Sequence, residues 1–308
     1  MPVTTPMLAW PDLDDARVVV PAPGDGPGNW AGAASAIRDG EDIYLTYRVR
    51  RPVAKGRGVS TIVARSHDGE DFAIVCEVHR EEFGAESFER PVLVRTDRGW
   101  RLYLSCARPA SKDWWIEALD AESVSALPEG SRTVVFSGDG RVALKDPVIV
   151  RGADQWHAWI CEHPLDVAGH EDRMSTSYWR SAEGLTWHRE RSVLSPRDNQ
   201  WDARGARVTD VLSLDPLVVL YDGRARAEDN WFEATGVASG EIDGVLTATD
   251  HPPMRSKYSD GAARYVTHVT MPDGSVRYYL EMARPDGAHD LVTAAPPQSL
   301  TPGNPQRL

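Results

Sequence analysis

Residues 89–94, with the sequence ERPVLV, recur 56 positions later as residues 145–150, KDPVIV. A short polar turn follows each copy, and then an aromatic and aliphatic run, WRLYL at 100–104 and QWHAW at 155–159. Apolar or alternating runs of about 4–8 residues bounded by Gly, Pro, Asp or Asn are typical of β-strands. Weaker copies of the same two runs start near Ala34, Ala206 and Ala263. The spacing therefore predicts a structural repeat of about 57 residues.

A second pattern lies inside this repeat. Residues 60–69, STIVARSHDG, match residues 175–184, STSYWRSAEG, and each segment continues to an aromatic residue, Phe72 or Trp187. The two segments are 115 positions apart, which is two repeat lengths. The form Ser-x-Asp/Glu-Gly-x-x-aromatic predicts a hairpin turn, because the acidic residue and the glycine adopt the backbone angles that such a turn needs.

The fold prediction follows from these repeats. We find no segment with the pattern of a helix of about ten or more residues, and each repeat has room for four short strands. Repeats of this kind are typical of a β-propeller. We therefore predict an all-β protein, a five-bladed β-propeller with four-stranded antiparallel blades, closed into a ring by an N-terminal strand at 16–20. The predicted single domain covers 1–294, with blades at about 33–88, 89–144, 145–203, 204–261 and 262–294, and residues 295–308 form a loose tail.

The composition excludes several classes of protein. The chain has 308 residues and a net charge of −12, from 34 Lys and Arg against 46 Asp and Glu. A nucleic-acid binder needs a basic face, so we expect no nucleic-acid partner. No apolar run reaches the roughly 18 residues of a membrane-spanning helix, so we expect no membrane partner. No signal peptide is visible, and three cysteines without metal-binding spacing suit a reducing compartment, which predicts a cytoplasmic protein. The composition leaves the oligomeric state open.

Charged residues stand at the predicted starts of several innermost strands. In a propeller these strands face the central channel, so residues far apart in the sequence converge at one end of the axis. Charges gathered there either neutralise one another as structural ion pairs or hold a substrate. As a set they predict a substrate site; they are Glu89, Arg90, Lys145, Asp146, Asp202, Arg204 and Asp260.

A five-bladed propeller with acidic residues before its inner strands, Asp-Pro-Val openings and these hairpin turns resembles the β-propeller glycoside hydrolases. These are the enzymes of families 43, 32 and 68 and the related mannoside phosphorylases of family 130. The resemblance covers nearly the whole chain and implies a glycosidase. In those families three carboxylates from successive inner strands serve as base or nucleophile, as acid, and as the group that tunes the acid and holds the sugar. Glycoside cleavage needs this division because one carboxyl must be protonated while another is ionised.

The resemblance implies catalytic roles for particular carboxylates. By position, Asp146 matches the aspartate of the family's Asp-Pro motif, Glu89 occupies the site of the preceding blade, and Asp202 that of the following blade. The families place their first carboxylate in blade one, where this chain has GNWAGA at 28–33. This departure leaves open a catalytic set shifted by one blade, a different chemistry, or a site that only binds. Glu162, at the end of the second strand of blade three, is a further candidate acid.

Arginines near the strand ends indicate an anionic substrate. Half of them are expected to tie blades together, but a guanidinium also binds a carboxylate or phosphate through two parallel hydrogen bonds. A uronic acid, a sugar phosphate or inorganic phosphate fits such a pocket. Flat rings, on which a pyranose stacks, complete the predicted substrate-binding set. The set is Trp30, Arg48, Arg90, Arg108, Lys145, His163, Trp201, Arg204, Tyr221, Arg224, Asp260 and Arg264.

No cofactor is predicted. The nine histidines show no HExxH or comparable spacing of metal ligands. His157, His163 and His268 lie on or beside predicted inner strands, and the resemblance to family 43 leaves open an axial cation near one of them.

These observations predict an enzyme that cleaves a short glycoside or a glycosylated metabolite, with an anionic group, by paired-carboxylate catalysis in the central channel. The expected partner is thus a small carbohydrate-like molecule. A glycoside phosphorylase using inorganic phosphate is the first alternative. A propeller that only binds a sugar or a protein, and non-hydrolytic chemistry on a sugar-like metabolite, are the others.

Overall fold

The computed structural model describes residues 10–297. Within them, helical structure is confined to the short 3-10 segments η1 (Val53–Lys55), η2 (Arg80–Phe83) and η3 (Val124–Glu129), so the predicted all-β class is confirmed. In the same residues, no helix has the length and apolar character needed to cross a membrane. The strands are β1 (Arg17–Val20), β2 (Trp30–Asp39), β3 (Asp42–Arg50), β4 (Gly58–Ser66), β5 (Ala73–His79), β6 (Phe88–Thr96), β7 (Gly99–Ala107), β8 (Trp114–Ala121), β9 (Ser131–Ser137), β10 (Val142–Arg151), β11 (Trp156–Pro164), β12 (Ser175–Ser181), β13 (His188–Leu194), β14 (Arg207–Leu214), β15 (Leu217–Gly223), β16 (Ala234–Gly240), β17 (Thr247–Ala248), β18 (Ala263–Thr270), β19 (Val276–Ala283) and β20 (His289–Ala294).

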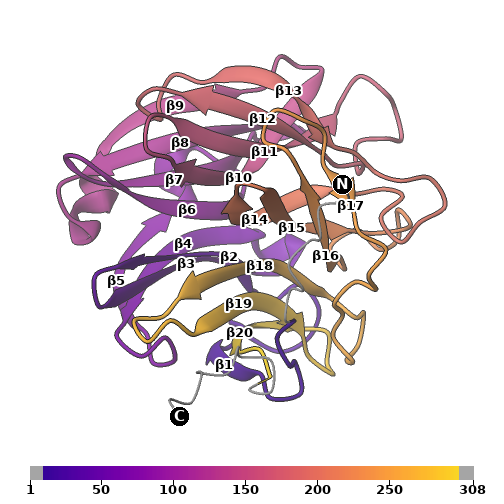
Figure 1. Ribbon diagram of the computed structural model, residues 1–308, viewed down its shortest axis with the longest axis horizontal. Coiled ribbons are helices and arrows are strands. Elements are labelled where there is room, and N and C mark those ends of the chain that lie inside the picture. The colour runs from indigo at the N-terminus through magenta and orange to yellow at the C-terminus, as the bar shows by residue number, and fades with distance from the viewer. Residues whose placement is uncertain (1–9, 298–308) are drawn as a thin grey trace, which may run out of the picture.

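The strands pair as antiparallel units of four. Strands β6–β9 form one sheet and β10–β13 another. The remaining strands form a twelve-stranded sheet, in which β2–β5, β14–β17 and β18–β20 with β1 are joined by single parallel pairs. The order of this sheet runs from β14 to β5, so the sheet itself is not closed. Figure 1 shows the first strands of the units, β2, β6, β10, β14 and β18, gathered near the centre of the view.

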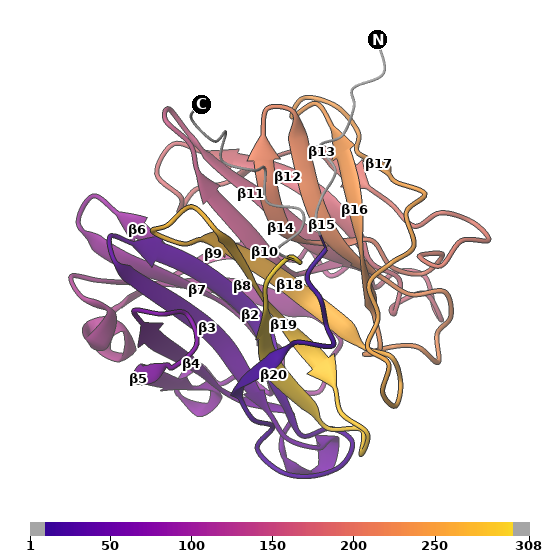
Figure 2. The ribbon, with the colours of Figure 1, turned by 60° about the horizontal axis from the view of Figure 1, so that its bottom comes forward.

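Apolar side chains fill the spaces between neighbouring units. One cluster packs Tyr44 of β3 against Leu102 of β7, and similar clusters lie between later neighbours. Another cluster packs Leu45 of β3 against Leu291 of β20, so the first and last units also share a core. Figure 2 shows β18–β20 lying between β2–β5 and β14–β17. At the same place β1 runs antiparallel to β20.

The hairpin turns predicted from the Ser-x-Asp/Glu-Gly pattern are confirmed. Gly69 and Gly184 have φ of 75° and 78°, and the N–H of each donates to the serine Oγ three residues earlier at 2.9 Å. Each turn also contacts a neighbouring unit, because Tyr279 donates to the carbonyl of Gly69 at 3.0 Å and Tyr103 to that of Gly184 at 2.7 Å. The repeated turns therefore connect units as well as strands.

Bulges in the inner strands aim side chains at the centre of the molecule. Ala33, Asp146 and Tyr265 have φ of 53°, 51° and 52°, and the strand ladders of β2, β10 and β18 change register around them. A bulge redirects the side chain of the extra residue. Asp146 and Tyr265 thus meet across the axis, with the tyrosine hydroxyl 3.3 Å from Oδ2 of Asp146.

Gly58 provides a test of how tightly the units are joined. A Cβ at this position would lie 2.0 Å from the carbonyl oxygen of Phe88, on the first strand of the next unit. Gly58→Ala is expected to lower the free energy of unfolding by about 1–3 kcal/mol, because the backbone of β6 must move. Urea unfolding followed by tryptophan fluorescence measures the change. Gly244→Ala, whose Cβ meets nothing closer than 3.4 Å, is the control, and equal effects of the two substitutions would contradict the prediction.

Candidate functional site

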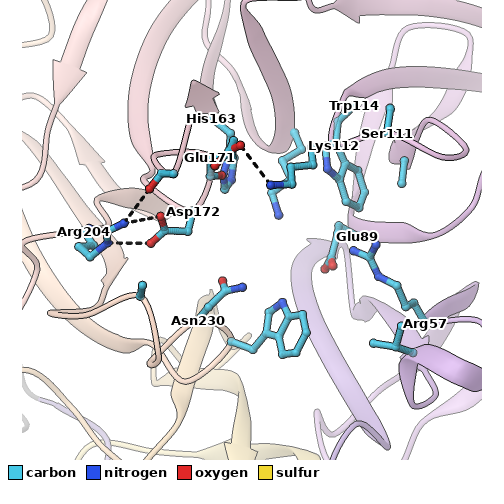
Figure 3. Close-up of a pocket in the computed structure, with 16 residues that line it drawn as sticks. Arg57, Glu89, Ser111, Lys112, Trp114, His163, Glu171, Asp172, Arg204 and Asn230 are labelled. Atoms are coloured by element: carbon cyan, nitrogen blue, oxygen red, sulfur yellow. Dashed lines mark hydrogen bonds and ion pairs between the residues drawn. The ribbon is translucent and has the colours of Figure 1, made fainter. Parts of the chain in front are cut away.

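A cavity of about 460 Å³ opens near the starts of the inner strands. Glu89 of β6 and Lys145 of β10 come from inner strands, and the other lining residues come from outer strand ends and loops. Figure 3 shows the side chains of several units around this space, with Glu89 across from Asp172 and Arg204. The polar and aromatic lining residues are Arg57, Glu89, Ser111, Lys112, Trp114, Lys145, His163, Glu171, Asp172, Arg204, Asn230 and Trp231.

Glu89 is the inner-strand carboxylate on the wall of the cavity. Its side chain is 7% exposed and forms an ion pair with Arg48, while the hydroxyl of Tyr265 lies 3.5 Å from Oε2. Burial alone would raise the pKa of Glu89, but Arg48 and Lys145 outweigh it and hold the pKa below the usual value. Glu89 is therefore ionised at neutral pH.

Asp146 lies behind the cavity wall and is fully buried. Arg207 contacts its Oδ2 at 2.9 Å and Lys145 lies 3.5 Å away, while the N–H of Arg90 donates to Oδ1 at 3.2 Å. Burial would raise the pKa of Asp146, but Lys145 and Arg207 lower it. Asp146 and Glu89 share the hydroxyl of Tyr265, so the two carboxylates are neighbours and only Glu89 reaches the cavity.

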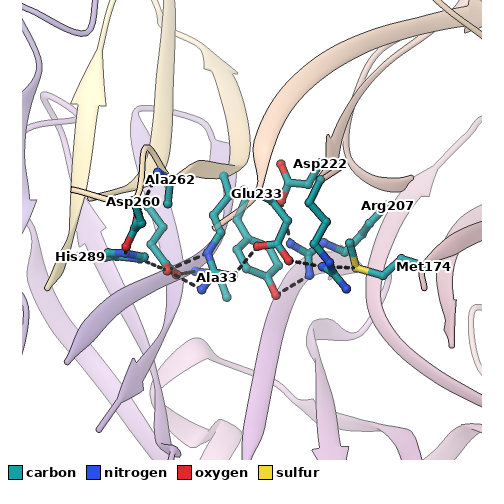
Figure 4. Close-up of polar contacts among 12 residues, drawn as sticks. Ala33, Met174, Arg207, Asp222, Glu233, Asp260, Ala262 and His289 are labelled. Atoms are coloured by element: carbon teal, nitrogen blue, oxygen red, sulfur yellow. Dashed lines mark hydrogen bonds and ion pairs between the residues drawn. The ribbon is translucent and has the colours of Figure 1, made fainter. Parts of the chain in front are cut away.

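A buried network of arginines and carboxylates supports this wall (Figure 4). Arg264 of β18 contacts Glu281 at 2.7 Å and Glu233 at 2.6 Å. Arg48 reaches Glu281 at 3.1 Å, and Arg224 reaches Glu233 at 2.5 Å. Starting at the cavity wall, the connected groups are Glu89, Arg48, Glu281, Arg264, Glu233 and Arg224.

The network keeps its carboxylates charged although they are out of contact with water. Burial raises the pKa of Glu281 and of Glu233, but Arg264 and the second arginine beside each of them lower both below the usual range. A buried ion pair is stable only when further hydrogen bonds satisfy the remaining polar atoms. His289 supplies such a bond, with Nδ1 2.8 Å from Glu281 and Nε2 3.1 Å from Asp260.

The basic side chains that line the cavity differ in whether they form ion pairs with carboxylates. Lys112 pairs with Glu171 at 3.2 Å and Arg204 with Asp172 at 2.5 Å. Arg57, by contrast, forms no ion pair with any residue in 10–297. Lys145 lies near the buried Asp146. Because Lys145 pairs with Asp146 at 3.5 Å, Arg57 is the lining cation whose charge is most available to an anion in this cavity.

His163 lines the cavity with a ring whose proton can be placed. Its Nδ1 is 3.0 Å from the carbonyl oxygen of Glu171, which only accepts, so Nδ1 carries the proton. Nε2 is buried and has no partner among the described residues. Burial and the nearby Lys145 lower the pKa of His163 to about 3, so the ring is neutral at pH 7.

Aromatic rings form part of the same wall. Trp114 and Trp231 line the cavity, and Trp231 is 38% exposed. Arg50 lies between the rings of Trp231 and Trp30, with its guanidinium carbon 4.7 Å and 3.9 Å from their centroids. Burial and the neighbouring Arg48 lower the pKa of Arg50 to about 9. The exposed face of Trp231 remains available for stacking on a sugar.

The structure brings some of the predicted site residues together. Glu89, Lys145, His163 and Arg204 line the cavity. A second layer directly behind them holds Asp146, Arg48, Arg224 and Arg264 in the ion-pair network.

Other predicted residues lie elsewhere. Asp202 is buried against Arg197 at 2.9 Å and Tyr221 at 2.8 Å, and Trp201 stacks on the same tyrosine. Glu162 pairs with Arg189 at 2.9 Å and lines a different cavity. These residues therefore do not meet Glu89 at the 460 Å³ cavity.

Four more of the predicted residues do not line the 460 Å³ cavity. Trp30 is only 2% exposed and stacks on His289, so it offers no free face to a sugar. Arg108 points to solvent and pairs with Asp113 at 2.9 Å. Asp260 binds His289 at the edge of the network and does not line the cavity. Arg90 lines a second cavity, described below.

Sequence reasoning did not assign roles to Trp114, Trp231, Glu233 and Glu281. The first three belong to a motif shared by two units, WWIEA at 114–118 and WFEA at 231–234, which signals a common structural role. Glu281 has no comparable motif. Lys112, Glu171 and Asp172 stand in loops, where spacing carries no periodic signal. Among residues 10–297, no cluster of His, Cys, Asp and Glu is arranged to hold a metal ion.

The lowered pKa values of Glu233 and Glu281 predict a loss of stability in acid. Their ordinary value is 4.5, so below about pH 4.5 the unfolded chain binds more protons than the folded protein. The free energy of unfolding should therefore fall as the pH drops from about 5 to about 3. Urea titrations at several pH values measure this slope. Glu281→Gln removes one titrating group and should show a shallower slope; an unchanged slope would contradict the assignment.

Solved structures share this fold at low sequence identity. A thermostable family-43 glycoside hydrolase has a TM-score of 0.67 at 13% identity, with 89% of this chain and 91% of that chain covered. An α-L-arabinofuranosidase from Lactobacillus brevis has a TM-score of 0.66 at 12% identity, with 86% and 90% covered. A β-1,2-mannobiose phosphorylase from Listeria innocua has a TM-score of 0.65 at 12% identity, with 92% and 95% covered. No protein-family model and no curated protein matches the sequence. At the level of the fold, the predicted resemblance to glycoside hydrolases and mannoside phosphorylases is confirmed.

Proposed function

We propose that this protein cleaves the glycosidic bond of a short glycoside or glycosylated metabolite that carries an anionic group, with Glu89 at the reacting bond. The observation that carries the proposal is an ionised glutamate on the wall of a 460 Å³ cavity that also exposes Arg57, Lys145 and Trp231. A cavity of this size suits a mono- or disaccharide. A ring stacks on Trp231, while the cations bind the anionic group.

The proposal includes a five-bladed propeller. Its blades are the five antiparallel units, and the pairing of β1 with β20 closes the ring in the manner of a shared blade. The apolar cluster between Leu45 and Leu291 supports the same closure. The proposal also includes a single domain at 1–294 with the blade limits given above; residues 1–9 of this domain, and residues 298–308 of the predicted tail, lie outside the described residues.

An anionic substrate would change the protonation of Glu89. Arg48 and Lys145 hold its pKa down, and a bound negative charge opposes their effect, so the pKa of Glu89 rises when the substrate is bound. Glu89 can then give its proton to the leaving oxygen. Asp146 remains ionised between Lys145 and Arg207, and it tunes Glu89 through Tyr265. For hydrolysis, Asp172 across the cavity is in place to orient water (Figure 3).

Glu89→Gln tests the proposed acid. Its loss should reduce kcat by about 10²–10⁴-fold, because an amide cannot protonate the leaving group. Release of reducing sugar from disaccharides of neutral sugars and of uronic acids measures the rate, because their poor leaving groups depend on protonation. Glu117→Gln is the matched control, since Glu117 is also buried and pairs with an arginine, Arg132, but lies outside the cavity. Full activity in both Glu89→Gln and Asp146→Asn would contradict the catalytic assignment.

Phosphorolysis is the second candidate, favoured by the absence of an ion-pair partner for Arg57 among the described residues. Phosphate held by Arg57 and Lys145 would replace water as the nucleophile. A phosphate oxygen forms a bond to the anomeric carbon as the bond to the leaving oxygen breaks, and Glu89 supplies the proton to that oxygen. One proton-donating carboxyl group then suffices, because phosphate needs no base for activation.

Product analysis with and without inorganic phosphate separates the two reactions. Phosphorolysis yields a sugar phosphate and requires phosphate, whereas hydrolysis proceeds in phosphate-free buffer. Under phosphorolysis, Arg57→Met should raise KM for phosphate at least about 10-fold, the equivalent of one lost charge-assisted contact. Arg65→Met, an exposed arginine on β4, is the control. Binding of an acidic sugar without turnover under either condition would instead identify a propeller that only binds.

A further inference from the structure

A second cavity, of about 370 Å³, lies at the other ends of the inner strands. On β6, Glu89 lines the first cavity, whereas Val92–Arg95 line the second. On β10, Lys145 lines the first and Val148–Arg151 line the second. Since a strand advances about 3.3 Å per residue, the two cavities open at opposite ends of the same strands. Strands β2, β14 and β18 also contribute to the second cavity.

Arg90 lines this second cavity without a protein partner. Its side chain is buried, at 1% exposure, and Nε and Nη1 have no hydrogen-bond partner among the described residues. The buried arginines of the network differ, because Arg48, Arg207 and Arg264 each form ion pairs with carboxylates. Burial lowers the pKa of Arg90, but a guanidinium stays charged in a protein. Asp210 and Asp146 favour its charged form from nearby without forming an ion pair with it among the described residues, and a buried charge that lacks a direct partner favours the binding of an anion.

Basic side chains outnumber acidic ones in the lining of this cavity. Asp210 is the acidic residue that lines the cavity, and its Oδ2 accepts bonds from Nδ1 and the N–H of His268, at 2.6 and 2.7 Å. The charge of Asp210 is thus directed to His268. Arg95 and Arg151 stand at the mouth of the cavity, where Arg151 is 39% exposed and pairs with Asp97. The lining as a whole has an excess of positive charge.

We propose that this cavity binds a small oxyanion, such as inorganic phosphate, sulfate or a short dicarboxylate, through the guanidinium of Arg90. An oxygen of such an anion accepts a charge-assisted hydrogen bond from the edge of the Arg90 guanidinium that faces the cavity, and the charges of Arg95 and Arg151 add to the attraction. The apolar walls, from Val92, Val94 and Val148, strengthen this interaction because they exclude water. The bound anion offsets the positive charge of the lining at the ends of the inner strands that are remote from Glu89. The site does not depend on the proposed glycoside chemistry.

Isothermal titration of the full chain with phosphate, sulfate and malonate tests the proposal, with buffer and counterions that carry no other oxyanion. The wild-type protein should bind one anion at this site, and Arg90→Met should weaken that affinity at least about 10-fold, as expected for the loss of a charge-assisted contact. Lys112→Met, which removes a cation from the first cavity, should leave the affinity unchanged. Arg151→Glu, at the exposed mouth, should weaken binding while the protein stays folded.

Thermal unfolding gives an independent readout. Added anion should raise the Tm of the wild-type protein and not that of Arg90→Met, because a ligand that binds the folded state stabilises it. Without anion, Arg90→Met should be at least as stable as the wild type, because it removes an unpaired buried charge. The proposal is overturned if the wild type shows no saturable binding, or if Lys112→Met abolishes binding that Arg90→Met retains. A lower Tm of Arg90→Met in anion-free buffer would likewise show that Arg90 is a structural residue.

Discussion

Arg264 joins Glu233 and Glu281 at the centre of the molecule, at 2.6 and 2.7 Å and almost without exposure. Its two partners belong to different units, so both ion pairs form only when those units stand at one spacing around the axis. Charges buried in this way are destabilising unless each is fully paired. The network therefore constrains the positions of the inner strands, and with them the bulges at Asp146 and Tyr265 and the walls of both cavities.

The charges of Glu89 and Asp146 depend on Lys145, which lines the cavity, and on groups that do not line it. Arg48 and Arg207 set the charge of Glu89 and Asp146 from behind, and Tyr265 connects the two carboxylates. The solvent-facing layer contributes cations and rings. Loop residues such as Lys112 and Asn230 are not part of the buried ion pairs. A substitution in these loops can therefore change the shape of the cavity without changing the charge of Glu89 or Asp146.

The repeat of ERPVLV and KDPVIV was sufficient to predict the strands, because alternating apolar residues have one stable arrangement in short bounded runs. Glu89 and Lys145, which stand at the predicted starts of these strands, line one cavity. The position of a residue along a strand, however, does not indicate how deeply its side chain is buried. The sequence therefore predicts Asp202 and Trp30 at the site, although both side chains are buried in contacts with other residues. Glu281, on a second strand of its unit, and Asp172, in a loop, follow no periodic rule, and only tertiary packing brings them to the site.

The pairing of β1 with β20 has a consequence for synthesis on the ribosome. The unit that contains both strands is assembled from the earliest and the latest parts of the described chain, at 17–20 and 289–294. Units such as β6–β9 consist of consecutive strands and can form while the chain is still being made. The shared unit cannot form until residues 289–294 have been made, so the edges of β1 and β2 that pair with β20 stay open until then. During that interval these edges are available for pairing with other chains, which is a route to aggregation.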